Sequence, residues 1–497
     1  MNIGSANPQQ GNSLRQSLAF SAAGNLGARS ISLLGFFILA RQLSPTEFGL
    51  MTMVAVFTDV ADLFMTMGMD AAIIQNPRAA ESHYSTAFWC NTIIGGISTA
   101  VFYILAVAIA GIYGVNELVP LIQTISFLFL LNSLIVVPIA VLKKRLQFRS
   151  IAAIEVVANL VGFSLAIYLA FQGWGVWALV VNQFANATID AILAFILAKW
   201  RPRLLFSRNE FVELWKVGGY LMGTNLVTYI IDKVDYFMIG SLIGAKTLGA
   251  YKLAFQIATL PRQVFYGILN RVLFPFYSAF LANGNKDRII AVHKQLMRMF
   301  AFFAVPLFIG LATIADHFVL SVLGKKWEEM IPMLGLLLIN FMVTLLSDFN
   351  SAIYLSSGRT KLQFYLSIFL RLDIILFIVV GIYIGGVQGL LIGFLLAKII
   401  NFFPFTYFAS RIMGYTIWDI MRNFTPMFLS GFFMFIVLQM GKWLIFTHPG
   451  NVLELVGLVA MGALSYLAAL AIFRKEIFEE VFRLVWSTRR AVEADGG

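Results

Sequence analysis

The chain has 497 residues, of which 60% are hydrophobic and 12% are charged. Soluble proteins carry about 25% charged residues, so this composition excludes a soluble enzyme and predicts a chain embedded in a lipid bilayer. The single cysteine, Cys90, excludes an intrachain disulfide and a CxxC metal site, and the four histidines are too scattered to form a ligand cluster. We therefore expect neither a metal nor a cofactor.

Apolar segments follow one another along the whole chain and are separated by short polar stretches. They predict an all-α integral membrane protein with about 14 transmembrane helices. The predicted spans are 16–40, 47–71, 84–112, 117–142, 151–171, 174–198, 212–241, 246–275, 298–322, 330–355, 362–384, 386–410, 420–441 and 451–473. No loop between them is long enough for a folded domain outside the membrane.

Lysine and arginine residues are distributed very unevenly between alternate loops. Of the 36 basic residues, 24 fall in loops on one side, 5 fall on the other side and the remainder lie within spans. Because basic loops stay in the cytoplasm, this asymmetry predicts an even number of spans with both termini cytoplasmic. The net charge of +11 is then a topology signal, and we expect no nucleic acid as a partner.

Short stretches recur in the same order in the two halves of the chain. Phe48-Gly49 resembles Leu248-Gly249 at an offset of 200, and three further pairs recur at offsets of 211 to 216. The pattern predicts two six-helix repeats related by an axis along the membrane normal. The predicted parts are an N-lobe at 1–211, a C-lobe at 212–411, an appended helix pair at 412–474 and a cytoplasmic tail at 475–497.

Three stretches resemble a known family. They are Phe-Ile-Leu-Ala-Arg-Gln-Leu-Ser-Pro-Thr-Glu-Phe-Gly-Leu at 37–50, the Gln75-Asn76-Pro77 turn, and the segment from Asp235 to Tyr251. The chain resembles the polysaccharide-exporter branch of the MOP flippase superfamily, and within it the colanic-acid and teichuronic-acid exporters, near the O-antigen flippases. This resemblance covers almost the whole chain. It implies two lobes around a central cavity, a bacterial inner-membrane location and transfer of undecaprenyl-diphosphate-linked oligosaccharide to the periplasmic leaflet. It also implies membrane lipids, a polysaccharide polymerase and assembly proteins as partners.

Ionisable residues inside membrane spans are costly, so they mark candidate functional positions. We expect four cations to attract the substrate diphosphate in the cavity: Arg29, Lys233, Arg262 and Arg371. Gating or ion-coupling candidates are the acids Asp59, Asp62, Glu155, Asp232 and Asp235. The repeat offsets place Asp62 opposite Arg262, and Glu155 opposite Arg371. These pairs either bind substrate or neutralise each other and join the lobes, and both interpretations stay open.

Two other functions compete with a flippase. One is a cation-coupled antiporter of the same superfamily, which the intramembrane bases disfavour for cationic drugs. The other is a membrane-embedded polysaccharide polymerase or ligase, which would be expected to need a large periplasmic loop, whereas the longest predicted loop is cytoplasmic. The sequence has no GxxxxGK[ST] loop for nucleotide hydrolysis and none of the HExxH or GxSxG catalytic motifs, and we expect the chain not to be an enzyme. Coupling to H⁺, to Na⁺ or to no ion stays open.

Overall fold

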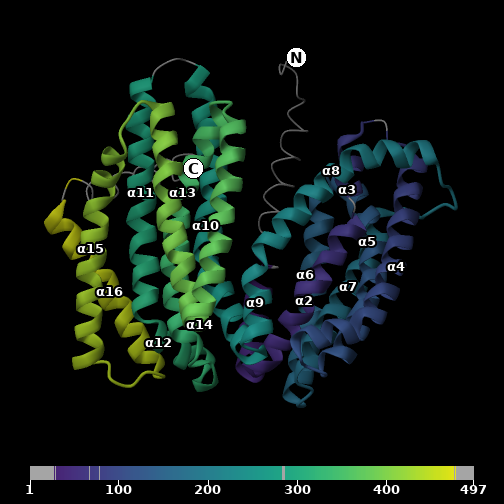
Figure 1. Cartoon of the computed structure of the whole chain (residues 1–497), viewed down its shortest axis with the longest axis horizontal. Coiled ribbons are helices and arrows are strands. Elements are labelled where there is room, and N and C mark those ends of the chain that lie inside the picture. The colour runs from purple at the N-terminus through teal and green to yellow at the C-terminus, as the bar shows by residue number, and fades with distance from the viewer. Residues whose placement is uncertain are drawn as a thin grey trace, which may run out of the picture. The chain divides into compact units, whose positions relative to one another are not determined.

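The computed structural model describes residues 27, 29–66, 68–77, 79–282, 286–474 and 476. These residues form helices and no strand, and they divide into two compact units, residues 1–249 and residues 250–497 (Figure 1). The predicted boundaries of lobes and appended pair, including the one at 211/212, stay predictions.

The first unit contains helical residues 29–42 and eight labelled helices, together with the start of α10. These helices are α2 (Pro45–Thr66), α3 (Met69–Gln75), α4 (Glu81–Tyr113), α5 (Leu118–Lys144), α6 (Phe148–Phe171), α7 (Val176–Ala198), α8 (Arg208–Asp232) and α9 (Val234–Leu242).

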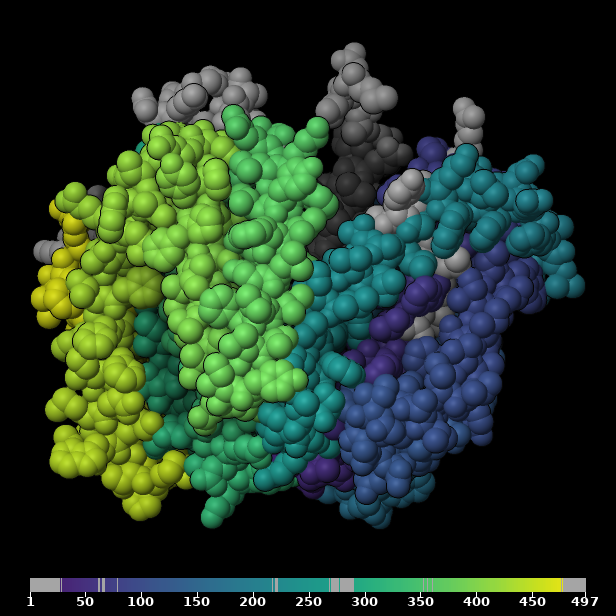
Figure 2. Space-filling view, in the orientation of Figure 1, coloured from purple at the N-terminus to yellow at the C-terminus, as the bar shows by residue number. Residues whose placement is uncertain are grey.

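The second unit holds the rest of α10 and the elements that follow it. These are α10 (Ala245–Ala282), α11 (Lys286–Thr313), α12 (Ala315–Phe318), the π-helix Val319–Leu323, the 3₁₀-helix Lys325–Trp327, α13 (Met330–Ser356), α14 (Thr360–Met413), α15 (Ile417–Leu444) and α16 (Val452–Phe473). Helices α14 and α15 cover one face of this unit (Figure 2).

Within the described part of the chain, nine helices are long and apolar enough to cross a membrane. One of them, α14, covers two predicted spans, 362–384 and 386–410. Three further predicted spans correspond to helices that are interrupted or carry more charged residues than those nine. The span at 47–71 corresponds to α2, the span at 212–241 to α8 and α9, and the span at 246–275 to α10. The span at 16–40 lies largely outside the described residues. The total of 14 therefore stays a prediction.

Helix α14 folds back on itself at two glycines. These are Gly385 and Gly386, and Gly386 has a φ of 58°, a backbone conformation that residues with a side chain disfavour. The halves on either side of this turn pack closely, because a Cβ on Gly381 would lie only 2.3 Å from the carbonyl oxygen of Gly389. The amide of Asn401 donates to the Leu370 carbonyl oxygen across this contact, at 2.8 Å. Small residues thus let the two halves pack backbone to backbone, as membrane helices require for close contact.

Two predicted spans are broken in the structure. Gly68, with a φ of 64°, separates α2 from α3, and Lys233 ends α8 and begins α9 with non-helical dihedral angles. Each break lets the chain change direction within the first unit. The break at Lys233 lies at a charged side chain, and the Lys233 carbonyl oxygen accepts the Phe237 N–H at 3.0 Å as α9 begins.

The N-terminal ends of α2 and α10 cross at very short range. A Cβ on Gly49 would lie 1.7 Å from the carbonyl oxygen of Ala245, and a Cβ on Gly249 would lie 1.8 Å from that of Pro45. The contact is reciprocal, and the same offset of 200 residues relates its two sides.

Candidate functional site

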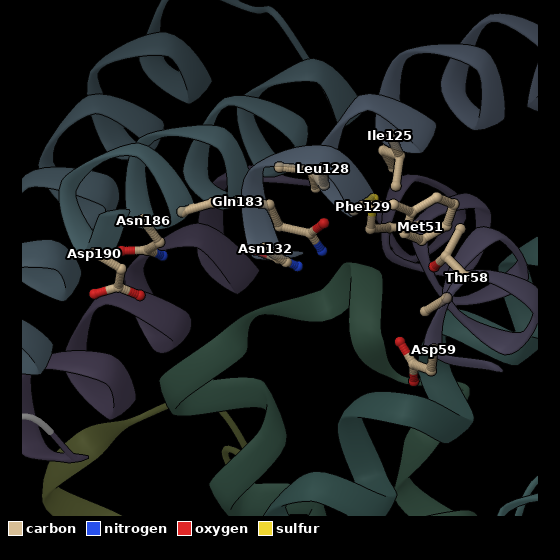
Figure 3. A pocket seen from close by; sticks show the side chains of 12 residues that line it. Met51, Thr58, Asp59, Ile125, Leu128, Phe129, Asn132, Gln183, Asn186 and Asp190 are labelled. Carbon is tan, nitrogen blue, oxygen red and sulfur yellow. The ribbon is translucent and has the colours of Figure 1, made fainter. Parts of the chain in front are cut away.

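The first unit contains a cavity of about 280 Å³ between α2, α5 and α7 (Figure 3). Its apolar wall includes Met51, Leu128 and Phe129. Its polar lining is long: Asp59 and Thr58 lie at one end, Asn132 and Gln183 in the middle, and Asn186 and Asp190 at the other end. In a chain with so few polar residues, this grouping makes the cavity a candidate binding site.

Polar residues of α7 repeat every fourth position and therefore share one face of the helix. The Asn186 amide donates to the Asn182 side-chain oxygen at 3.2 Å. The Asn186 side-chain oxygen, the Asn182 amide nitrogen and one carboxylate oxygen of Asp190 are buried without a hydrogen-bond partner. Buried polar groups normally have partners, so this row of polar side chains is an unusual feature of the helix.

Asp59 connects this cavity to Lys233. The Lys233 Nζ lies 3.5 Å from an Asp59 carboxylate oxygen, and the two side chains are 25% and 43% exposed. The same ammonium lies over the rings of Tyr229 and Tyr236, at 5.5 and 4.9 Å from their centroids. Aromatic faces attract cations, while an ion pair this exposed contributes about 1 kcal/mol or less. The Lys233 side chain is therefore positioned by the Tyr229 and Tyr236 rings together with a weak ion pair to Asp59, and not by a strong salt bridge.

The two other acids near this break differ in burial. Asp235 is buried, and its carboxylate accepts the backbone N–H of Tyr236 at 2.8 Å in the first turn of α9. A carboxylate at a helix N-terminus is favourably placed with respect to the helix dipole. Asp232, the last residue of α8, is exposed.

In the second unit, Arg262 pairs with Asp348. The Arg262 Nε and Nη2 atoms donate to the two carboxylate oxygens of Asp348 at 2.9 and 3.2 Å. Asp348 is 13% exposed, and the guanidinium also lies 5.3 Å from the centroid of the Tyr266 ring. This two-point geometry is the strongest arrangement that an arginine makes with a carboxylate.

The remaining predicted site residues have different settings. Arg29 and Glu155 are exposed, and Arg371 is partly buried. Glu155 belongs to the first unit and Arg371 to the second, so their pairing stays a prediction. The side chain of Asp62 lies outside the described residues, and its pairing with Arg262 stays a prediction as well.

Sequence reasoning did not assign a site role to five of the polar residues that line the cavity: Thr58, Asn132, Gln183, Asn186 and Asp190. The sequence did contain one indication of this site: two amides and an acid, Asn182, Asn186 and Asp190, recur at a four-residue spacing on α7, which is otherwise largely apolar. The partner of Arg262 was also missed, because Asp348 lies 86 residues away and the repeat offsets do not connect them.

Comparison with known proteins assigns the family. Residues 38–332 match the model of the family described as "Polysaccharide biosynthesis protein". The chain belongs to this family. It is 30% identical to the teichuronic acid biosynthesis protein TuaB of Bacillus subtilis (strain 168), over 67% of this chain and 69% of that protein. It is 26% identical to the lipopolysaccharide biosynthesis protein WzxC of Escherichia coli (strain K12), over 73% and 74% of the two chains.

The fold is similar to that of a solved transporter. The lipid II flippase MurJ, in an inward closed conformation, superposes with a TM-score of 0.70 at 13% identity, over 92% of this chain and 99% of that chain. At this identity the similarity establishes the fold alone. The chain is thus a multi-pass membrane protein of the polysaccharide biosynthesis family, and its fold is similar to that of MurJ.

Proposed function

We propose that the chain flips undecaprenyl-diphosphate-linked oligosaccharide repeat units from the cytoplasmic to the periplasmic leaflet of the bacterial inner membrane. Family membership and the flippase fold support transport in polysaccharide biosynthesis. The observation that carries the proposal further is the cavity of the first unit, which combines amides, carboxylates and an adjacent cation inside a membrane-embedded bundle.

The lining of this cavity suits a sugar. Amide and carboxylate side chains supply both donors and acceptors, which match the hydroxyl groups of an oligosaccharide. The apolar wall around Phe129 complements the less polar faces of sugar rings. The side chains of Asn186 and Asp190 line the cavity and contribute to this set of donors and acceptors.

Lys233 is placed to attract the diphosphate. Phosphate competes with the Asp59 carboxylate for the Lys233 ammonium. The single contact between Asp59 and Lys233, at 3.5 Å, is easily replaced by a contact to phosphate. In this proposal Arg29 and Arg371 add positive charge for the same anionic group, whereas the predicted diphosphate contact of Arg262 is weakened because Asp348 compensates its charge. Asp59, Asp62, Glu155, Asp232 and Asp235 gate the cavity or couple it to an ion. The cycle is alternating access, with both termini in the cytoplasm and a polymerase consuming the product.

The test is deletion of the gene followed by analysis of lipid-linked intermediates. We expect the deletion strain to accumulate undecaprenyl-linked oligosaccharide in the cytoplasmic leaflet, and the wild-type gene to reverse this. Lys233→Ala should reduce export at least about tenfold at normal protein level, since a charge-assisted contact to phosphate is worth at least about 1.4 kcal/mol. Lys233→Arg should retain part of the activity because the charge survives.

Lys361→Ala is the matched control, since Lys361 is exposed in the first turn of α14. It removes the same charge from a residue that does not line the cavity, and it should leave export unchanged. A deletion strain that makes normal surface polymer and accumulates no lipid-linked intermediate would contradict the proposed function. Normal export by an abundant Lys233→Ala protein would remove Lys233 from the site.

A further inference from the structure

The connection between α7 and α8 carries bases and large apolar side chains next to one another. Six of its side chains are exposed: Lys199, Arg201, Arg203, Leu204, Leu205 and Phe206. Leu204 is 88% exposed, the largest fraction of any large hydrophobic residue that the structure describes, and Phe206 is 62% exposed. An exposed apolar group bordered by charges is typical of an interaction surface.

The backbone of this connection is fixed to the first turns of α4. The Arg203 N–H donates to the Ser85 hydroxyl oxygen at 3.2 Å, and the Arg203 carbonyl oxygen accepts the Trp89 indole N–H at 2.7 Å. The Ser207 N–H donates to the Thr86 hydroxyl oxygen at 3.0 Å. The three apolar residues between these two anchors therefore belong to a segment that is held in place, and their side chains stay uncovered within the first unit.

The apolar surface continues onto the first turns of α8. The rings of Phe206 and Phe211 lie with their centroids 6.4 Å apart, and Phe211 stacks on Trp215 at 6.2 Å. Val212 and Trp215 are 43% and 38% exposed. Phenylalanine, leucine and tryptophan side chains beside lysines and arginines are typical of segments that lie in a membrane–water interface.

Acids and bases of this region are separated in space. The two acids of α8 contact the turn between α3 and α4, where Glu210 accepts the Ser82 hydroxyl at 2.5 Å and Glu213 accepts the Asn76 amide at 2.9 Å. His83 lies 3.6 and 3.4 Å from these two carboxylates. Five exposed bases form no ion pair with any carboxylate in the described part of the chain: Lys199, Arg201, Arg203, Arg208 and Lys216.

The remaining residues of the first unit cannot neutralise these five bases. Residues 1–28 contain one base and no acid. In the rest of residues 1–249, Asp62 is the only acid whose side chain lies outside the described residues, and one carboxylate compensates at most one base. The loop asymmetry predicts that this connection is cytoplasmic, where anionic lipid headgroups attract basic segments.

We propose that residues 199–216, here called the interfacial segment, dock onto the anionic phospholipids of the cytoplasmic leaflet. The bases contact the headgroup phosphates, and Leu204 and Phe206 enter the boundary between headgroups and acyl chains. At a membrane surface these two environments adjoin, which matches bases and apolar side chains that alternate within eight residues. The occupant is bulk membrane lipid and not the transported substrate.

The test places a fluorescent label on the interfacial segment of the full-length protein. Leu204→Cys is combined with Cys90→Ala, so that bimane reacts at one position, and the protein is reconstituted into lipid nanodiscs. The discs contain phosphatidylcholine with a rising fraction of phosphatidylglycerol, and the acyl chains of both lipids are brominated to quench the label. We expect quenching to rise with the phosphatidylglycerol fraction, while aqueous iodide quenches less.

The decisive variant is Arg201→Gln/Arg203→Gln. Arg203 reaches α4 through backbone atoms, so its replacement keeps both anchors. Each basic residue contributes about fivefold to association with an anionic leaflet. The double variant should therefore raise the phosphatidylglycerol fraction needed for half-maximal quenching at least about fivefold. The matched control Arg359→Gln/Arg411→Gln removes the same charge from the same predicted membrane face, and it should change this fraction less than twofold.

Three outcomes would overturn the proposal. Iodide quenching that is strong at every lipid composition would show that the interfacial segment stays in water. A label that neither quencher reaches would show that protein covers the segment. Quenching by brominated chains that is independent of phosphatidylglycerol, or unchanged in Arg201→Gln/Arg203→Gln, would show that the bases select no anionic lipid. The assay involves no transport, so its result is independent of the proposed function.

Discussion

The two units of the chain use intramembrane charge in different ways. In the first unit, Lys233 and Asp59 meet through one contact of 3.5 Å beside an open cavity, and Asp59 is 43% exposed. In the second unit, Arg262 and Asp348 meet through two shorter contacts, and Asp348 is 13% exposed. The comparison teaches that exposure and contact geometry, rather than the presence of an acid and a base, separate a structural pair from a pair that a ligand can open.

The largest expected effect comes from breaking the pair of the second unit. Asp348→Ala leaves the Arg262 guanidinium partly buried without its carboxylate, which we expect to cost about 3 kcal/mol of stability. The measurement is the amount of protein in the membrane together with its thermal unfolding in detergent. Both should fall, whereas Asp59→Ala in the first unit should lower stability by about 1 kcal/mol or less.

The double variant Arg262→Met/Asp348→Leu is the control for this prediction. It removes both charges and should restore most of the lost stability, because no uncompensated charge remains. If Asp348→Ala protein is as abundant and as stable as the wild type, the pair is not structural, and the contrast between the two units fails.

An intermediate effect is expected from the amides of the first unit. Asn186→Ala removes a buried oxygen that has no partner but also the hydrogen bond to Asn182, so the two effects oppose each other and stability should stay within about 1 kcal/mol of the wild type. Polymer export should fall several-fold, because the side chain lines the cavity. Surface polymer measured at matched protein level tests this prediction.

Asn91→Ala provides the matched control. Asn91, on α4, is also buried with both side-chain polar atoms unpartnered, but it does not line the cavity. Its replacement should leave stability equal or higher, with normal export. Equal loss of export in the two variants would mean that the cavity position of Asn186 is irrelevant.

The smallest effect concerns pH at one end of the second unit. Burial raises the pKa of Asp316, but hydrogen bonds from Lys442, at 2.6 Å, and from His317 outweigh it and hold the pKa below its ordinary value. The folded state therefore binds fewer protons than the unfolded state, and stability falls as the pH drops below about 4. Thermal unfolding of Asp316→Asn between pH 3 and pH 7 should lack this part of the decline, which we expect to be about 1 kcal/mol.

The outcome at neutral pH provides the check. There Asp316→Asn should be less stable than the wild type, and the difference should shrink as the pH falls. A difference that stays constant with pH would show that the carboxylate charge contributes nothing at this position.

Much of the fold follows from hydrophobic patterning. The spans predicted at 84–112 and 330–355 agree closely with α4 and α13, because long apolar segments bounded by polar residues leave few alternatives. The breaks at Gly68 and Lys233 were not predicted, since a helix with an interruption has the same composition as one without. The cavity could not be predicted from the sequence either, because it depends on which faces of α2, α5 and α7 pack against each other.

The crossing of α2 and α10 has a consequence for biogenesis. Gly49 packs against backbone that lies about 200 residues later in the chain, and ribosomes add about 5–20 residues per second. For about 10–40 seconds the nascent first unit therefore waits in the membrane with its glycine surface uncovered. A membrane chaperone that covers small-residue helix surfaces would therefore act on this chain during this interval, before α10 is synthesised and inserted.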